Sequence, residues 1–182
     1  MGIRREIRRE DFDQVYEIYM DETVNPYVNF EIMGKDEFRP IFDEMLERGG
    51  LEIYELDGEV ISALIISRFQ HRLKHLAYIG AFGIKRSYQG RGIGTKIMQE
   101  LIRDLESDGI RRIELRVEAD NHRAISFYMK LGFEAEGTLR KYMKRERMPI
   151  LLMCIRWLCC WSKISQLDFR REVLDPTPHS PH

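Results

Sequence analysis

The chain has 182 residues, a length that suits one domain, because two separate cores would each be small. Hydrophobic residues make up 43% of the chain and charged residues 32%, as in ordinary globular proteins. The formal net charge of −1 excludes a strong overall field that would attract nucleic acid or an anionic membrane surface.

The amino-terminal part of the chain predicts one strand and two helices. Residues 3–8 alternate between apolar and polar side chains, which is typical of a short strand. Asp11 is placed to cap a helix over residues 12–20, whose apolar side chains fall on one face. Residues 35–47 repeat this helical pattern, and the Gly49-Gly50 pair should end the second helix.

Strands and helices then alternate. Two apolar runs, 51–56 and 59–69, flank Asp57-Gly58, a pair that favours a two-residue hairpin turn. Residues 76–84 predict another strand. Asp120 or Asn121 should open the last helix and Gly132 should close it. The remaining predicted elements are helices over residues 93–106 and 121–131 and strands over residues 110–117, 133–139 and 150–158. This order predicts a mixed α/β domain over residues 1–158, with helices crossing over between strands, and a loose carboxyl-terminal extension over residues 159–182.

A glycine-rich stretch joins a predicted strand to a predicted helix. It reads YQGRGIGT over residues 88–95. Glycines at a helix amino terminus let an anion approach unpaired backbone N–H groups, and Arg91 or Lys96 would add positive charge. A tight turn without a ligand is the alternative. The order of Thr95 and Lys96 excludes a P-loop, and the absence of glycine at position 95 excludes the dinucleotide fingerprint.

The same stretch carries a resemblance to a known family. QGRGIG resembles the [QR]-x-x-G-x-[GA] motif of the GNAT superfamily of acetyl-CoA-dependent N-acyltransferases, and NHRAISFYMKLGF over residues 121–133 is similar to a second segment of that family. Two motifs at a sensible separation are more specific than either alone. The resemblance covers residues 3–145 and implies the GNAT fold, a mostly antiparallel mixed sheet of six to seven strands with about four flanking helices.

The resemblance also implies a binding site for acetyl-CoA as co-substrate. Gly80 and Gly83 in the preceding strand suit a bulge or a close backbone approach, or they face a crowded helix. By resemblance, the backbone of this strand pairs with the pantetheine arm, the glycine loop holds the pyrophosphate, and Asn121 contacts the arm. The cofactor-binding residues expected in this way are Phe82, Gly83, Ile84, Gln89, Gly90, Arg91, Gly92, Ile93, Gly94, Thr95, Asn121 and Tyr128.

Tyr128 matches the residue that serves the family as general acid for the departing thiolate, although its spacing also suits a core aromatic. The implied reaction is direct transfer to a neutral amine through a tetrahedral intermediate. Ile79 and Arg116 stand where family members often carry the glutamate that acts as base. The base is therefore unassigned. The candidates are Glu118, His75, Tyr78 and Glu31.

By resemblance, the segment between the two early helices sets the choice of acceptor, and its aromatic and apolar residues suit a small or apolar group. The arrangement resembles family members that acetylate free amino acids or similar small amines, so a small primary amine is expected as the acceptor. An enzyme acting on a protein amino terminus and a non-catalytic acyl-CoA sensor remain alternatives. We expect no metal, no nucleic-acid partner, no membrane association and a cytoplasmic location, since the amino-terminal segment lacks an apolar signal core.

Three cysteines, Cys154, Cys159 and Cys160, lie late in the chain in an apolar setting and suggest buried, reduced thiols. From Cys159 onward the chain is expected either to cover the surface of a homodimer or to form a loose extension.

Overall fold

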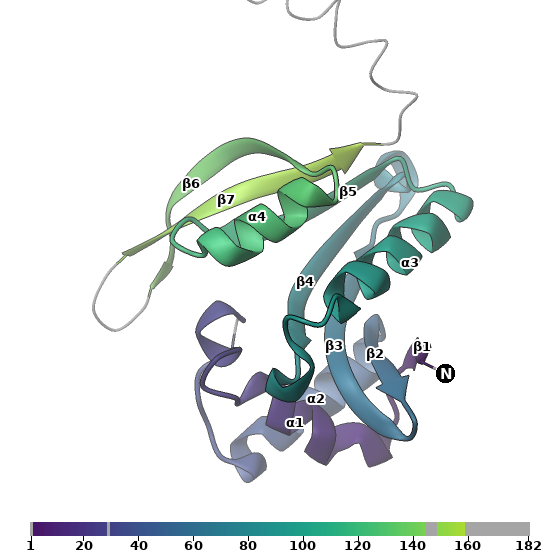
Figure 1. The fold of residues 1–182 in the computed structure, drawn as a ribbon, viewed down its shortest axis with the longest axis vertical. Helices are drawn as coiled ribbons and strands as arrows, with labels where there is room; N and C mark the ends of the chain where they lie inside the picture. The colour runs from purple at the N-terminus through teal and green to yellow at the C-terminus, as the bar shows by residue number, and fades with distance from the viewer. Residues whose placement is uncertain (1, 29, 145–148, 159–182) are drawn as a thin grey trace, which may run out of the picture.

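The computed structural model describes residues 2–28, 30–144 and 149–158, and all of its strands join one mixed sheet (Figure 1). The strand order is β1-β2-β3-β4-β5-β7-β6. Every neighbouring pair is antiparallel except β4 and β5, which run parallel. The strands are β1 (Ile3–Glu6), β2 (Leu51–Leu56), β3 (Glu59–Arg68), β4 (Leu76–Ile84), β5 (Arg112–Glu118), β6 (Glu134–Lys144) and β7 (Pro149–Leu158).

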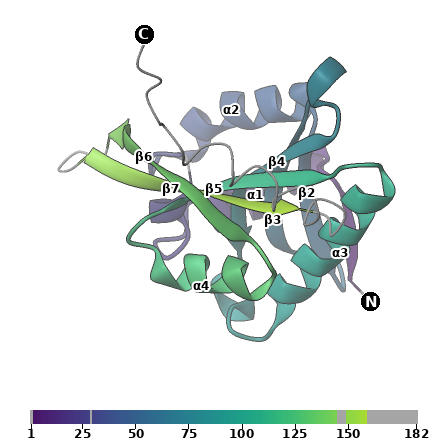
Figure 2. The same ribbon diagram turned by 90° about the horizontal axis from the view of Figure 1, so that it is seen from above.

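Four α-helices pack on the two faces of the sheet. They are α1 (Phe12–Tyr19), α2 (Lys35–Arg48), α3 (Ile93–Ser107) and α4 (His122–Lys130). Figure 2 shows the sheet between α2 on one side and α3 and α4 on the other. The core divides accordingly, with α1 and α2 packing in one cluster and α3 and α4 in the other. The prediction of a mixed, mostly antiparallel sheet with about four helices is confirmed.

Local sequence signals explain most of these elements. Asp57 and Gly58 both have positive φ, 51° and 86°. A two-residue hairpin turn whose twist matches that of its strands requires positive φ at both positions. The five apolar residues that α3 buries recur at helical spacing: Ile97, Met98, Leu101, Ile102 and Leu105. Strand β6 runs to Lys144, five residues beyond its predicted end, because it pairs with β7 along that length.

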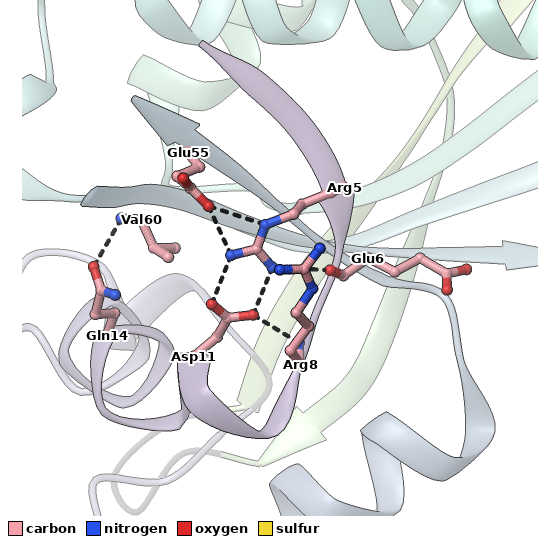
Figure 3. Close-up of polar contacts among 7 residues, drawn as sticks. All are labelled: Arg5, Glu6, Arg8, Asp11, Gln14, Glu55 and Val60. Atoms are coloured by element: carbon pink, nitrogen blue, oxygen red, sulfur yellow. Dashed lines mark hydrogen bonds and ion pairs between the residues drawn. The ribbon is translucent and has the colours of Figure 1, made fainter. Parts of the chain in front are cut away.

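Asp11 stands at the N-cap position of α1, as predicted, but its side chain makes no capping hydrogen bond to the helix. Instead its carboxylate accepts two hydrogen bonds from the Arg5 guanidinium, at 2.7 and 2.8 Å, and a third from the backbone N–H of Arg8 (Figure 3). Arg5 also donates to Glu55 at 2.7 and 2.9 Å. This network ties β1, β2 and the turn before α1 together, and a charge-assisted bidentate pair outcompetes a single cap.

The predictions on the cysteines and on membrane association can be compared with the described residues. Cys154 is a free, half-buried thiol, whereas Cys159, Cys160 and the predicted extension lie outside the described residues. In the part of the chain that the structure describes, every helix falls short of the length and apolarity that crossing a bilayer requires.

Candidate active site

Strands β4 and β5 separate halfway along their length. They pair from Leu76↔Arg112 to Ile79↔Leu115, and beyond this point β4 pairs only with β3 while β5 pairs only with β7. Figure 1 shows the two strands diverging towards the carboxyl end of β4. The separation leaves backbone groups on the facing edges of both strands without a partner in the sheet, which is the place where an added strand-like ligand can bind.

A bulge in β4 accompanies the separation. Between the pairs Ala63↔Gly83 and Ile65↔Gly80, one residue of β3 faces two of β4, and Ala81 there has a φ of 46°. The predicted bulge is therefore present. Gly83 also faces a crowded helix, which was the alternative expectation for these glycines, because a Cβ on it would lie 2.9 Å from Ile18 Cγ2 on α1.

Two cavities meet at this opening in the sheet. The larger has a volume of about 680 Å³ and extends along the glycine loop and α4. The smaller, of about 90 Å³, lies between the diverging strands. Both are lined by Tyr27, Phe82, Asn121, Ala124 and Tyr128. An elongated ligand in the larger cavity can therefore place its end against a second molecule in the smaller one.

The glycine loop forms one wall of the larger cavity. Gly90 and Gly92 have φ of 74° and 76°, and a Cβ at either position would meet no protein atom within 4 Å. Helix α3 begins directly after Gly92, and its first backbone bond runs from Lys96 N–H to the Gly92 carbonyl. The N–H groups before Lys96 have no acceptor within the helix. Glycine is needed here for a left-handed turn that also keeps this helix end open to an anion.

Helix α4 forms the opposite wall. Arg123, Ser126, Phe127 and Lys130 line the larger cavity at a spacing that matches one helical face. The helical pattern of the sequence could have revealed this stripe, but the prediction used it only for core packing. Asn121 caps the helix, because its side-chain oxygen accepts a hydrogen bond of 3.0 Å from the Ala124 N–H.

Tyr128 lies at the junction of the two cavities and is only 7% exposed. Its ring makes edge contacts with Phe127 and Phe133, at centroid distances of 5.0 and 5.5 Å. Burial, and to a smaller extent the nearby Tyr78, raises the pKa of its phenol above the ordinary value. The two sequence-based expectations, a core aromatic and a site residue, are therefore compatible with one position.

The predicted cofactor residues gather as expected, with two exceptions. All of them except Arg91 and Ile93 line the larger cavity. Ile93 packs against the core cluster, and the exposed Arg91 guanidinium carbon lies 5.7 Å from the centre of the Tyr88 ring. Lys96 is directed towards Tyr54 and Glu100. The positive side chains that do line the cavity, Arg123 and Lys130, come from α4.

The candidate bases separate into two groups. Glu118, at 6% exposed, and Tyr78 line the smaller cavity, whereas His75 and Glu31 are not among its lining residues. Burial raises the pKa of Tyr78, and the neighbouring Arg116 opposes that shift.

Among the described residues, no three His, Cys, Asp or Glu side chains gather as a metal ion would require.

Arg116 and Tyr142 also line the smaller cavity, and the sequence did not predict that they would meet there. The Arg116 guanidinium carbon lies 5.3 Å from the centre of the Tyr78 ring and 4.7 Å from that of Tyr142, and Arg116 donates a hydrogen bond to the Tyr142 hydroxyl. These three residues come from β5, β4 and β6, so only the strand order brings them together.

Comparisons with known proteins agree with this geometry. The family model described as "Acetyltransferase (GNAT) family" matches residues 12–133. N-alpha-acetyltransferase 50 of Danio rerio is 32% identical over 120 residues, 65% of this chain and 70% of the relative. The L-amino acid N-acetyltransferase AaaT of Escherichia coli strain K12 is 35% identical over 108 residues, 57% of this chain and 65% of the relative.

A solved structure shows the same fold. It is a GNAT superfamily phosphinothricin acetyltransferase from Sinorhizobium meliloti in complex with AcCoA, with a TM-score of 0.68, 18% sequence identity, and coverage of 86% of this chain and 88% of that one. The family match over most of the chain, on this fold, identifies the protein: it belongs to the GNAT family of acetyltransferases and is an acyltransferase.

Proposed function

We propose that the protein transfers the acetyl group of acetyl-CoA directly to the primary amine of a small substrate, an amino acid or a similar molecule. The observation that carries this proposal is the position of Tyr128, buried where a long cavity and a short one meet between two separated strands. The long cavity suits the cofactor and the short one suits the acceptor.

The residues of the larger cavity fit acetyl-CoA. The unpaired N–H groups at the start of α3, beside the left-handed Gly90 and Gly92, suit a pyrophosphate. The backbone of residues 82–84, no longer paired with β5, suits the amide groups of a pantetheine arm. When bound, acetyl-CoA supplies the activated acetyl group, and Arg123 and Lys130 add positive charge along the cavity.

Tyr128 is protonated at neutral pH, since an ordinary tyrosine titrates near 10 and burial raises the pKa of Tyr128 further. A phenol that remains protonated donates a hydrogen bond to the sulfur as negative charge develops there. Its raised pKa makes complete proton transfer to a thiolate less favourable, since an ordinary thiol titrates near 8.5. We therefore assign Tyr128 first to stabilising the leaving thiolate and second to delivering its proton.

Glu118 is our choice for the group that takes the proton from the acceptor amine. Of the four candidates, only Glu118 and Tyr78 line the acceptor cavity. At neutral pH a phenol whose pKa is raised carries its own proton and cannot accept another, whereas a carboxylate can.

The test is thiol release from acetyl-CoA in the presence of a panel of free amino acids and simple amines. We expect amine-dependent release by the wild type and a loss of about 10²- to 10⁴-fold in kcat for Tyr128→Phe, the usual range for a general acid. Tyr54→Phe is the matched control, because Tyr54 is another buried tyrosine that lines neither cavity. Tight acetyl-CoA binding without release for any amine would favour the alternative of a non-catalytic acyl-CoA sensor.

A protein amino terminus is the second candidate acceptor. The name of the zebrafish relative refers to an α-amino group, which a protein amino terminus and a free amino acid both carry. The name of the bacterial relative refers to L-amino acids. The side chains of the smaller cavity, which we propose binds the acceptor, have to distinguish a free amino acid from a protein amino terminus.

A further inference from the structure

The positive charge of Arg116 affects which acceptors the smaller cavity can bind. Resemblance to the family leads one to expect a base at this point of β5, and a guanidinium has the opposite charge and cannot accept a proton at physiological pH. Its side chain nevertheless lines the smaller cavity together with Glu118 and Tyr128. A change of this kind alters what the cavity can bind.

The guanidinium is held by aromatic rings from two other strands. Tyr78 on β4 and Tyr142 on β6 lie within 5.3 and 4.7 Å of its central carbon, and the Tyr142 hydroxyl accepts one of its hydrogen bonds. The two rings and the hydrogen bond to Tyr142 hold the guanidinium at the smaller cavity. A guanidinium carries five N–H donors in a planar fork, so the donors that Tyr142 does not use suit a bidentate anion.

Other arginines on this sheet surface have a different role. Arg112 forms ion pairs with Glu114 and Glu136, and Arg156 pairs with Glu136 at 3.0 Å. These two arginines balance carboxylates on β5 and β6, and neither lines the smaller cavity. Arg116 is the arginine that lines the acceptor cavity.

We infer that Arg116 binds a carboxylate of the acceptor and thereby selects free amino acids. This inference rests on the proposed acetyltransferase function. Arg116 and Glu118 are two residues apart on β5, so their side chains leave the same face with Cα atoms about 6.5–7 Å apart. An α-amino acid fits between them, with its amine towards Glu118 and Tyr128 and its carboxylate on Arg116.

This arrangement separates the two acceptor classes. In a free amino acid the carboxyl group beside the reacting amine is an anion. In a protein amino terminus the same carbonyl is part of a neutral peptide bond. Only the former forms an ion pair with a guanidinium through two parallel hydrogen bonds, whereas a neutral carbonyl accepts a hydrogen bond without adding an opposite charge. An acidic side chain of a peptide could offer the same chemistry, and the experiment therefore includes it.

The experiment compares kcat/KM for matched acceptors. Alanine, leucine and phenylalanine are each tested as the free acid, as the carboxamide, and as the first residue of two amidated tetrapeptides, one neutral and one with aspartate at the second position. We expect the free acids to exceed their carboxamides by about 10- to 100-fold, the range for one charge-assisted hydrogen bond. The neutral peptides should behave as the carboxamides do, and the peptides with aspartate should gain little.

Arg116→Gln should bring the ratio of free acid to carboxamide close to one, mainly through a higher KM for the free acid. Arg116→Lys should give an intermediate ratio, since lysine keeps the charge without the planar fork. Arg103→Gln is the matched control on the exposed face of α3 and should keep the wild-type ratio. Thermal unfolding of each variant checks that it is folded.

Three outcomes would overturn the inference. The first is that carboxamides or peptides are accepted as well as free acids. The second is that Arg116→Gln and Arg103→Gln give equal ratios of kcat/KM for free acid to carboxamide. The third is that no free acid is accepted. Turnover of carboxamides or peptides alone would leave the acetyltransferase proposal standing. Absence of turnover with every acceptor would instead contradict the proposed function itself.

Discussion

The side chain of Gln89 donates a hydrogen bond of 2.9 Å to the backbone carbonyl of Ile84. This contact joins the first residue of the glycine loop to the last residue of β4. Arg123 of α4 donates in turn to the Gln89 side-chain oxygen, at 3.3 Å. The motif glutamine thus ties the glycine loop to β4 and to α4, and its structural effect on the loop is separate from any contact of its own with the cofactor.

Gln89→Ala should weaken acetyl-CoA binding by about fivefold, which corresponds to about 1 kcal/mol for one net hydrogen bond. The reason is that the loop loses its attachment to β4. Titration calorimetry with acetyl-CoA measures the change. Gln99→Ala, on the exposed face of α3, is the control. Equal dissociation constants for the two variants would argue against a positioning role for Gln89.

Gly92→Ala should reduce both stability and cofactor binding. Gly92 has a φ of 76°, and a side chain in this conformation costs about 1–2 kcal/mol. Its Cβ would also project into the space of the larger cavity, where no protein atom lies within 4 Å. We expect a lower unfolding temperature together with at least tenfold weaker acetyl-CoA binding.

The matched control is Gly109→Ala, just beyond the other end of α3. Gly109 has a similar φ of 85° and equally open surroundings, but it does not line the larger cavity. It should therefore lose comparable stability and keep its affinity for acetyl-CoA. If both variants lost affinity equally, loss of stability alone would account for the effect.

The sequence predicted elements whose signals are local. The turn at Asp57 and Gly58 and the apolar face of α3 depend on residues a few positions apart, so their patterns can be recognised without the fold. The glycine loop was recognised from its own residues at a strand-to-helix junction, and Tyr128 was assigned to the site because the family motif marks its position. That the Asp11 side chain binds Arg5 instead of capping α1 could not be predicted, because Arg5 belongs to another element.

The lining of the smaller cavity could not be predicted in the same way. Arg116 meets Tyr78 and Tyr142 only because β4, β5, β7 and β6 lie in that order in the sheet. The position of the β4–β5 separation likewise depends on a bulge and on pairing registers. Such contacts between distant residues leave no periodic signal in a single sequence.

The pH dependence of the reaction should show no alkaline loss that belongs to Tyr128 below pH 10. In the proposed mechanism the tyrosine acts in its protonated form, and burial raises its pKa above the ordinary value of about 10. Activity that depends on this proton is therefore retained as pH rises through that value. The measurement is kcat from pH 6 to 10.5 with background hydrolysis of acetyl-CoA subtracted. An alkaline limb centred below pH 9 in the wild type, and missing in Tyr128→Phe, would contradict this assignment.

Asp11→Asn should lower stability at neutral pH and make it less sensitive to acid. Burial tends to raise the pKa of Asp11, but hydrogen bonds from Arg5 and from the Arg8 N–H outweigh burial and lower it. A lowered pKa means that the carboxylate contributes stability above the unfolded value of about 3.9, and that this contribution is lost as pH falls through the folded pKa. Breaking the pair also leaves the Arg5 guanidinium with only Glu55 and the backbone carbonyl of Glu6 as hydrogen-bond partners among the described residues, at a cost of about 1–3 kcal/mol.

Thermal unfolding between pH 7 and pH 3 measures both effects. The difference in unfolding temperature between wild type and Asp11→Asn should be largest near pH 6 and shrink once the pH falls below the unfolded value of about 3.9, because the contribution of the carboxylate is lost from there down through its lowered folded pKa. Glu10→Gln, an exposed neighbour in the same turn, should track the wild type throughout. A difference that stayed constant with pH would mean that Asp11 stabilises the fold by packing, because only a charge-dependent contribution follows the titration of the carboxylate.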